Sequence, residues 1–165
     1  MLKITKLNTY YGGLHILKDL NLEVRDGEMV CLIGANGAGK STLLKAISGL
    51  LRPASGTIEF NGVVTTRMKP RQIVDQGITQ VPEGRLVFAG LNPAETMQTM
   101  AQVKKIRDTG VTIFLVEHNM KAIMSTCDRI MVLNQGNKIA EGTPKEISEN
   151  KEVIEAYLGK GMAEV

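Results

Sequence analysis

Hydrophobic and polar residues alternate near the start of the chain and give way to solid apolar runs further along. Residues 20–24 alternate strictly, and residues 2–9 carry apolar side chains at every second or third position. This alternation is typical of strands that bury one face, so we predict two half-exposed antiparallel strands. Residues 29–33 (Met-Val-Cys-Leu-Ile) and 111–116 (Val-Thr-Ile-Phe-Leu-Val) are apolar almost throughout. They predict buried strands, and the second run is the strongest buried strand of the chain.

The rest of the pattern predicts helices alternating with short strands. Residues 43–47 carry apolar side chains at helical spacing, and residues 94–107 predict a moderately amphipathic helix with Pro93 near its start. Further predicted elements are helices at 69–76, at 119–126 and twice after Pro144, and strands at 57–60, 77–81 and 129–133, the last entering a hairpin at 134–137. This order, rich in strands first and alternating later, predicts an α/β fold with an antiparallel flank.

A complete phosphate-binding loop joins the first apolar run to its helix. It reads Gly34-Ala35-Asn36-Gly37-Ala38-Gly39-Lys40-Ser41-Thr42. The context of strand, glycine-rich turn and helix separates it from an ordinary turn. Glycines let the backbone wrap an anion, so that successive N–H groups point at phosphate oxygens. Lys40 can bridge the β- and γ-phosphates, and the Ser41 hydroxyl can bind Mg²⁺. The loop therefore predicts a site for a nucleoside triphosphate.

Length, charge and cysteine content add limits on the number of domains, the partners and the disulfides. A length of 165 residues fits one domain, and a net charge of +3 is too small to indicate a nucleic-acid partner. Cys31 and Cys127 are better interpreted as small buried hydrophobic residues than as a disulfide. No apolar leader and no run of 18 apolar residues occurs, so we expect a cytosolic protein that reaches a membrane only through a partner.

The chain around the loop resembles the ATP-binding subunits of ABC transporters. The residues that carry the resemblance, at family spacing, are Tyr11-Gly12-Gly13, Leu17-Lys18-Asp19-Leu20, Asp26-Gly27-Glu28, the loop itself, Ile47-Ser48-Gly49-Leu50, Pro53-Ala54-Ser55-Gly56-Thr57-Ile58 and Asn61-Gly62. Residues 78–88 are similar to one ATP-binding subunit of branched-chain amino-acid importers, and the tail from 90 to 159 is similar to the other. The resemblance implies a P-loop core, ATP and Mg²⁺, integral membrane permease subunits and a second ATP-binding subunit as partners, and a place at the cytoplasmic face of the inner membrane.

Part of the family pattern is missing. Between Phe88 and Asn92 a family member carries a helical subdomain, a Leu-Ser-Gly-Gly-Gln-type signature and an apolar strand ending in Asp-Glu (the Walker B strand), and none occurs here. We interpret residues 1–165 as a single truncated ATP-binding domain with a deletion junction near 88–92. In this family the missing strand belongs to the central sheet, which we therefore expect to be incomplete. Either residues 78–81 pair with 111–116 or a groove remains between them.

The resemblance also implies roles for individual residues. Tyr11 stacks on adenine, with Tyr10 as the alternative, and the loop contributes Gly34, Asn36, Gly37, Ala38, Gly39, Lys40, Ser41 and Thr42. His118 matches the switch histidine that contacts the γ-phosphate. Glu83 stands where most relatives have a glutamine that senses Mg²⁺ and the partner subunit. The resemblance therefore implies that Glu83 is a catalytic residue alongside His118 and, with Ser41, a metal ligand, although a surface glutamate in a turn is an equally good interpretation. Gln80 and Glu117 imitate family positions and receive no role in catalysis.

The implied function is ATP binding that energises the import of branched-chain amino acids. Phosphoryl transfer depends on positioning and on charge stabilisation. Without the signature and the acidic strand, we expect the chain to retain ATP binding but to lose ATP hydrolysis. The alternatives are a non-catalytic nucleotide-binding partner of a full-length homologue and a remnant without function.

Overall fold

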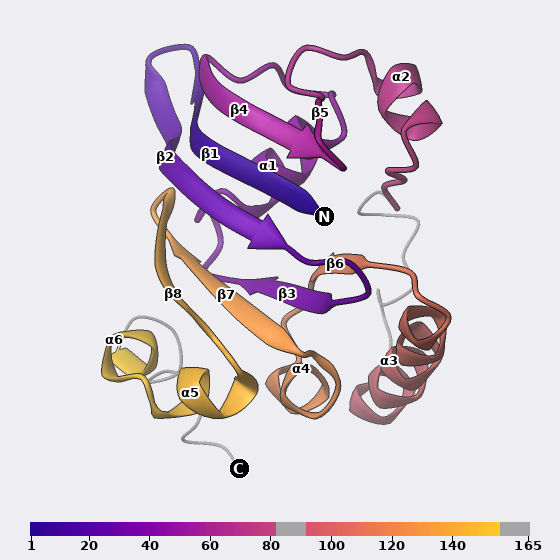
Figure 1. Cartoon of the computed structure of the whole chain (residues 1–165). Coiled ribbons are helices and arrows are strands. Elements are labelled where there is room, and N and C mark those ends of the chain that lie inside the picture. The colour runs from indigo at the N-terminus through magenta and orange to yellow at the C-terminus, as the bar shows by residue number, and fades with distance from the viewer. Residues whose placement is uncertain (82–91, 156–165) are drawn as a thin grey trace.

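A computed structural model describes residues 1–81 and 92–155, which form two four-stranded sheets with helices packed on them (Figure 1). The first sheet is antiparallel and has the order β2-β1-β4-β5. Its strands are β1 (Leu2–Tyr11), β2 (Leu14–Val24), β4 (Ser55–Phe60) and β5 (Val63–Val64). Leu2, Ile4 and Leu7 are buried, as the alternation predicted.

The second sheet is mixed and has the order β6-β3-β7-β8. β3 pairs in parallel with both β6 and β7, and β8 returns antiparallel to β7. Its strands are β3 (Met29–Ile33), β6 (Ile113–Val116), β7 (Arg129–Asn134) and β8 (Asn137–Gly142). All five residues of β3 are buried, because both faces of this strand are covered.

Helices pack on the sheets, and two hydrophobic cores lie on opposite faces of β3. Their bounds are α1 (Lys40–Ile47), α2 (Pro70–Asp75), α3 (Pro93–Asp108), α4 (Met120–Thr126), α5 (Pro144–Glu149) and α6 (Lys151–Val153). One core lies between the two sheets and includes Leu43 of α1 with Val30 and Leu32 of β3. The other core lies on the opposite face of β3, where Met100 of α3 and Ile123 of α4 pack on it. The α/β fold class, the P-loop core and the antiparallel flank are therefore confirmed.

Two predicted strands differ from the structure. Residues 78–81 form no strand, so the prediction for 77–81 is wrong. The run 111–116 is a strand only over Ile113–Val116, and these four residues are half-buried rather than fully buried. β6 is the edge strand of its sheet, so β3 is its only strand neighbour in the described residues. Of the two expected outcomes, the described residues show the groove: residues 77–81 line it opposite residues 111–116 and do not pair with them.

The cysteines behave as predicted. Cys31 and Cys127 are buried and unbridged, and both belong to the core under α4. Burial, followed by a hydrogen bond with Cys127, raises the pKa of the Cys31 thiol well above its ordinary value. Cys31 therefore stays a neutral thiol inside the core. Among the helices described, none has the length and apolar character needed to cross a membrane.

Candidate functional site

The phosphate loop runs from the buried end of β3 into the first turn of α1. Gly34 follows Ile33 directly, and Gly39, with φ 107°, is the N-cap residue just before α1. Within the loop the Ala38 N–H donates to the Ala35 carbonyl at 3.1 Å. Lys40 and Thr42 are buried, whereas Asn36 and Gly37 are exposed. The loop thus presents its tip to solvent while its root and the helix are fixed in the core.

Two neighbouring segments hold the loop from the side. The Gly136 N–H, in the turn between β7 and β8, donates to the Ala38 carbonyl at 3.0 Å, and the Gly136 carbonyl accepts from the Lys18 N–H of β2 at 3.0 Å. Gly136 has φ 85°, and a Cβ there would collide with the Ile16 carbonyl. The sequence predicted this turn as a hairpin, but its contact with the loop joins distant segments and could not be predicted from local pattern.

The polar groups of the loop suit an anion. Within the described residues, the backbone N–H groups of Asn36, Gly37 and Gly39 donate no hydrogen bond. The Lys40 ammonium lies over the loop and donates to the carbonyls of Gly34 at 2.6 Å and Ala35 at 2.9 Å. Ser41 is half-buried in the first turn of α1. A row of N–H donors, a helix N-terminus and an ammonium group together favour phosphate oxygens.

The two candidate tyrosines lie at the end of the hairpin between β1 and β2. Tyr11 pairs with Leu14, and Tyr10 stacks on His15 with ring centroids 4.2 Å apart. Tyr11 is 47% exposed. A Cβ at Gly39 would lie 2.8 Å from the Leu17 side chain of β2, so this strand passes close to the loop. One face of Tyr10 is therefore covered by His15, while Tyr11 is exposed.

His118 lies at the same end of the mixed sheet as the loop. Val116 of β6 pairs with Leu32 of β3, and His118 and Gly34 each follow two residues later. The His118 side chain is exposed. The sheet thus brings the histidine and the phosphate loop to one edge.

Glu117 has a structural role that the sequence did not reveal. Its Oε1 accepts hydrogen bonds from the backbone N–H groups of His118 at 2.8 Å and Asn119 at 3.0 Å. The Asn119 side chain in turn accepts from the Ala122 N–H and caps α4. Glu117 is 9% exposed. The carboxylate therefore shapes the turn that carries His118, and a local signal for this was present in the acidic residue directly after the strand.

Two other predicted positions, Glu83 and Gln80, are not found at the phosphate loop in the described residues. Glu83 lies outside the described residues, as does the proposed junction except for Asn92 at its end. Gln80 is half-buried, and its side-chain oxygen is enclosed without a hydrogen-bond partner in the described part of the chain. Gln80 lines the groove beside β6 rather than the phosphate loop.

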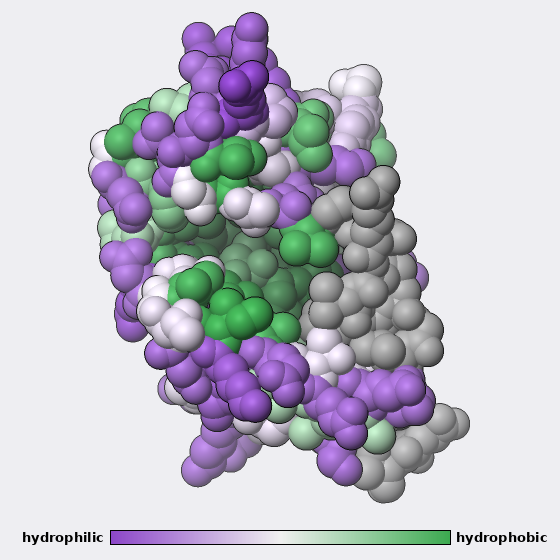
Figure 2. Space-filling view, turned by 90° about the vertical axis from the view of Figure 1, so that its right-hand side faces the viewer, coloured by the Kyte–Doolittle hydropathy of each residue, from purple (hydrophilic) through white to green (hydrophobic). Residues whose placement is uncertain are grey.

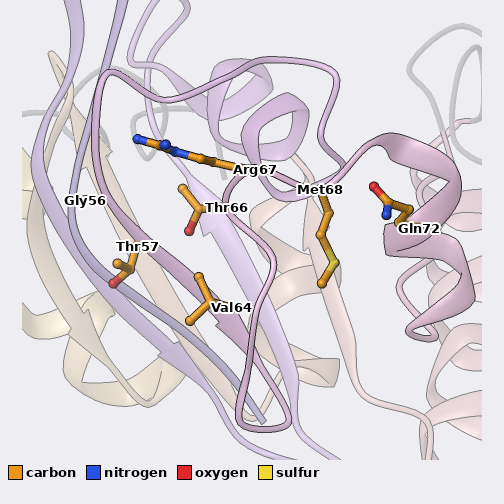
Figure 3. Close-up of a pocket in the computed structure, with 7 residues that line it drawn as sticks. All are labelled: Gly56, Thr57, Val64, Thr66, Arg67, Met68 and Gln72. Carbon is orange, nitrogen blue, oxygen red and sulfur yellow. The ribbon is translucent and has the colours of Figure 1, made fainter.

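A separate pocket of about 460 Å³ opens between the antiparallel sheet and α2 (Figure 3). Its lining includes Thr57, Thr66 and Gln72, and among the described residues Arg67 is the charged side chain that lines it. The Arg67 side chain is exposed. This pocket shares no lining residue with the phosphate loop, and its surroundings define no chemistry.

The fold and the loop define a P-loop protein that binds nucleoside triphosphates. A comparison with protein families places it further: the family described as ABC transporter matches residues 17–153. The chain therefore belongs to the ABC transporter family, as an ATP-binding cassette. The resemblance predicted from the sequence is confirmed.

Curated relatives include proteins named for branched-chain amino-acid transport. The chain is 29% identical to the high-affinity branched-chain amino acid transport ATP-binding protein BraG of Pseudomonas aeruginosa, over 96% of this chain and 100% of BraG. It is 27% identical to LivG of Salmonella typhimurium, which bears the same description, over 97% of this chain and 98% of LivG. The alignment with BraG spans 232 positions, whereas this chain has 165 residues, so the alignment opens gaps in this chain.

Solved structures show the same fold. A nucleotide-free ATP-binding cassette from an ABC transporter superposes with a TM-score of 0.86 at 19% identity, over 95% of this chain and 98% of the other. The cbiO1 protein of Clostridium perfringens, part of the complex cbiONQ, superposes with a TM-score of 0.77 at 22% identity, over 99% and 98%. At these identities the likeness concerns the fold alone.

Proposed function

We propose that this chain binds ATP with Mg²⁺ at the phosphate loop and descends from the ATP-binding subunits of branched-chain amino-acid importers. The observation that supports this most strongly is the loop itself. It combines three N–H groups without partners in the described residues with a buried lysine and the start of α1. The relatives BraG and LivG supply the proposed transport context.

Each of these residues would contact a different part of the bound Mg-ATP. The loop N–H groups and Lys40 would hold the phosphates, and Ser41 would bind Mg²⁺, which neutralises phosphate charge when present. Tyr11 has an exposed ring at the end of the hairpin between β1 and β2 and would stack on the adenine. His118 would face the γ-phosphate from the end of β6, held there by the turn that Glu117 stabilises. Glu83 would be a second Mg²⁺ ligand.

We expect this chain to bind ATP but to hydrolyse it slowly or not at all. Glu117 uses its carboxylate to hold backbone N–H groups, so it is a poor general base. Between Lys40 and His118 the sequence has no apolar strand ending in Asp-Glu and no Ser-Gly-Gly signature. By its likeness to BraG and LivG, the chain would work at the cytoplasmic face of the inner membrane beside permease subunits and a second ATP-binding subunit. The same absences favour a non-catalytic partner of a full-length homologue as the second candidate.

The test is nucleotide binding measured together with phosphate release. A fluorescent ATP analogue with Mg²⁺ is titrated into the chain and into Lys40→Ala, and phosphate release is followed in the same samples. We expect saturable binding that falls about 30-fold in Lys40→Ala, which corresponds to about 2 kcal/mol for a hydrogen bond to a charged group. We also expect phosphate release at background level. Equal binding by both proteins would refute the proposed site, and rapid release sensitive to Lys40→Ala would refute the loss of turnover.

A further inference from the structure

An apolar groove of about 630 Å³ opens beside β6. Residues 77–81 line it together with residues 111–116, and Val103 of α3 and Ile47 of α1 also contribute. Figure 2 shows it as a hollow whose walls are mostly hydrophobic. No charged side chain of the described residues lines this groove. We call it the β6 groove.

The strand beside the groove has an edge without a partner strand. Ile113 donates its N–H to the Glu28 carbonyl at 2.9 Å, on the side of β3. Because backbone groups alternate between the two edges of a strand, Phe114 and Val116 turn theirs towards the groove. Within the described residues these groups find no strand to pair with. A row of unpaired N–H and C=O groups is a template for another backbone.

A second observation also indicates a hydrogen-bonding occupant. The Gln80 side-chain oxygen is enclosed, lines the groove and has no hydrogen-bond partner in the described residues. A buried acceptor left unpaired destabilises the protein, so an N–H donor in the groove would relieve that cost. Acceptors and donors thus face the hollow from the β6 edge and from Gln80.

We infer that the β6 groove binds an extended, uncharged apolar peptide segment of a partner protein, which adds to the mixed sheet as a strand next to β6. A backbone satisfies the free edge of β6, alternate apolar side chains match the lining, and the lack of charged lining residues excludes a charged occupant. The four residues of β6 offer an edge of about 13 Å, enough for a short strand.

Other occupants fit the observations less well. A lipid chain would cover the apolar walls but would leave the backbone groups of β6 and the Gln80 oxygen unpaired. A second folded copy would present its β6 edge together with the residues that line the same groove, residues 77–81 and Val103. Those lining residues oppose an approach of two β6 edges to the strand spacing of about 4.8 Å. An extended segment enters a groove of this shape and meets both requirements.

The test uses a synthetic peptide as the probe. It has the sequence Gln-Val-Leu-Val-Ile-Val-Gln, without charged side chains. It is amidated at its end and carries fluorescein at its start, and its binding to the full chain is followed by fluorescence anisotropy. The control peptide has the same sequence with N-methyl groups on alternate residues, which remove N–H donors. We expect saturable binding of the first peptide only. Hydrogen exchange followed by NMR should show added protection at the Phe114 and Val116 amides, which non-specific adhesion would not produce.

Matched variants locate the binding on the protein. Val81→Lys and Val111→Lys place a charge in the groove at residues that are 64% and 47% exposed. Val74→Lys and Ile106→Lys do the same outside it, at 55% and 52% exposure. We expect the groove variants to weaken peptide binding at least about tenfold, because a charge in an apolar site is costly, and the controls to change it little.

Several results would overturn the inference. They are no peptide binding by a chain that melts cooperatively, equal binding of the N-methylated peptide, equal effects of groove and control variants, or displacement of the peptide by laurate at an equal concentration. A concentration-dependent dimer that Val81→Lys abolishes would assign the groove to a second copy instead. None of these readouts depends on ATP, so the result is independent of the proposed nucleotide site.

Discussion

Single residues around the phosphate loop explain why the loop holds its shape. Lys40 donates to two loop carbonyls, and Gly136 connects Ala38 to β2 through one N–H and one carbonyl. The loop residues could be predicted from the sequence because the motif is contiguous. The support from Gly136 could not, because it depends on a turn about a hundred residues further along the chain.

Replacement of Gly136 tests this support. Gly136→Ala adds a Cβ that meets the Ile16 carbonyl at a residue with positive φ. We expect the free energy of unfolding in urea to fall by about 2–3 kcal/mol, since strain and a backbone collision add. Gly62→Ala is the control, because Gly62 has φ 80° but open space around it, and it should cost about 1 kcal/mol. Equal losses in the two variants would contradict the close approach.

Substitutions at Glu117 test whether its carboxylate has a structural role. Glu117→Gln keeps an oxygen that accepts from His118 and Asn119, so we expect the free energy of unfolding to change by less than about 1 kcal/mol. Glu117→Leu leaves both N–H groups without that acceptor and should cost about 2 kcal/mol. Urea unfolding of the three proteins measures this. The prediction fails if Glu117→Gln destabilises as much as Glu117→Leu.

At the scale of elements, helix caps and partner strands explain which predicted helices and strands are present. The predicted helix at 94–107 appears as α3, Pro93–Asp108, because Asn92 accepts from the N–H groups of Ala94 and Glu95 and fixes its start. The predicted strand at 77–81 is absent, although its residues suit a strand. A strand also needs a partner, and local pattern does not contain that information.

The cap of α5 gives a pH-dependent prediction. The Thr143 N–H and, next, its hydroxyl donate to Glu146, and these hydrogen bonds lower the pKa of the Glu146 carboxyl. A lowered native pKa contributes stability above the ordinary carboxyl pKa of about 4.3, and this contribution is lost as the pH falls through the native value. We therefore expect Glu146→Gln to be less stable than the parent chain at pH 7, with the difference shrinking below about pH 4.

Urea unfolding between pH 3 and 7 measures this difference. Glu149→Gln, at the end of the same helix, is the control and should not reproduce the pH dependence. A difference between Glu146→Gln and the parent chain that stays constant over this range would show that the cap is not ionic.

At the scale of the whole molecule, the described residues form an antiparallel sheet and a mixed sheet, and the mixed sheet has β6 at its edge. The α/β class, the buried β3 and the antiparallel flank could all be predicted, because each depends on periodicity or on a contiguous motif. The half-burial of β6 could not, because burial depends on which strand lies beside it. The free edge of β6 in the described residues therefore has its clearest consequence at this scale, as the β6 groove.

The central claim is that the phosphate-binding core of the cassette binds ATP in this shortened chain. A thermal melt of the chain with and without Mg-ATP, alongside Lys40→Ala, tests it most directly. At about a hundred times its dissociation constant, the ligand adds about 2.7 kcal/mol to the folded state. For a chain of this size that is a rise of about 5–10 °C in Tm. We predict one cooperative transition that Mg-ATP raises by this amount in the parent chain. In Lys40→Ala, with binding about 30-fold weaker, the same ligand concentration adds only about 0.9 kcal/mol, so Tm should rise about a third as much. A transition that ignores Mg-ATP, or moves equally in both proteins, would contradict the claim.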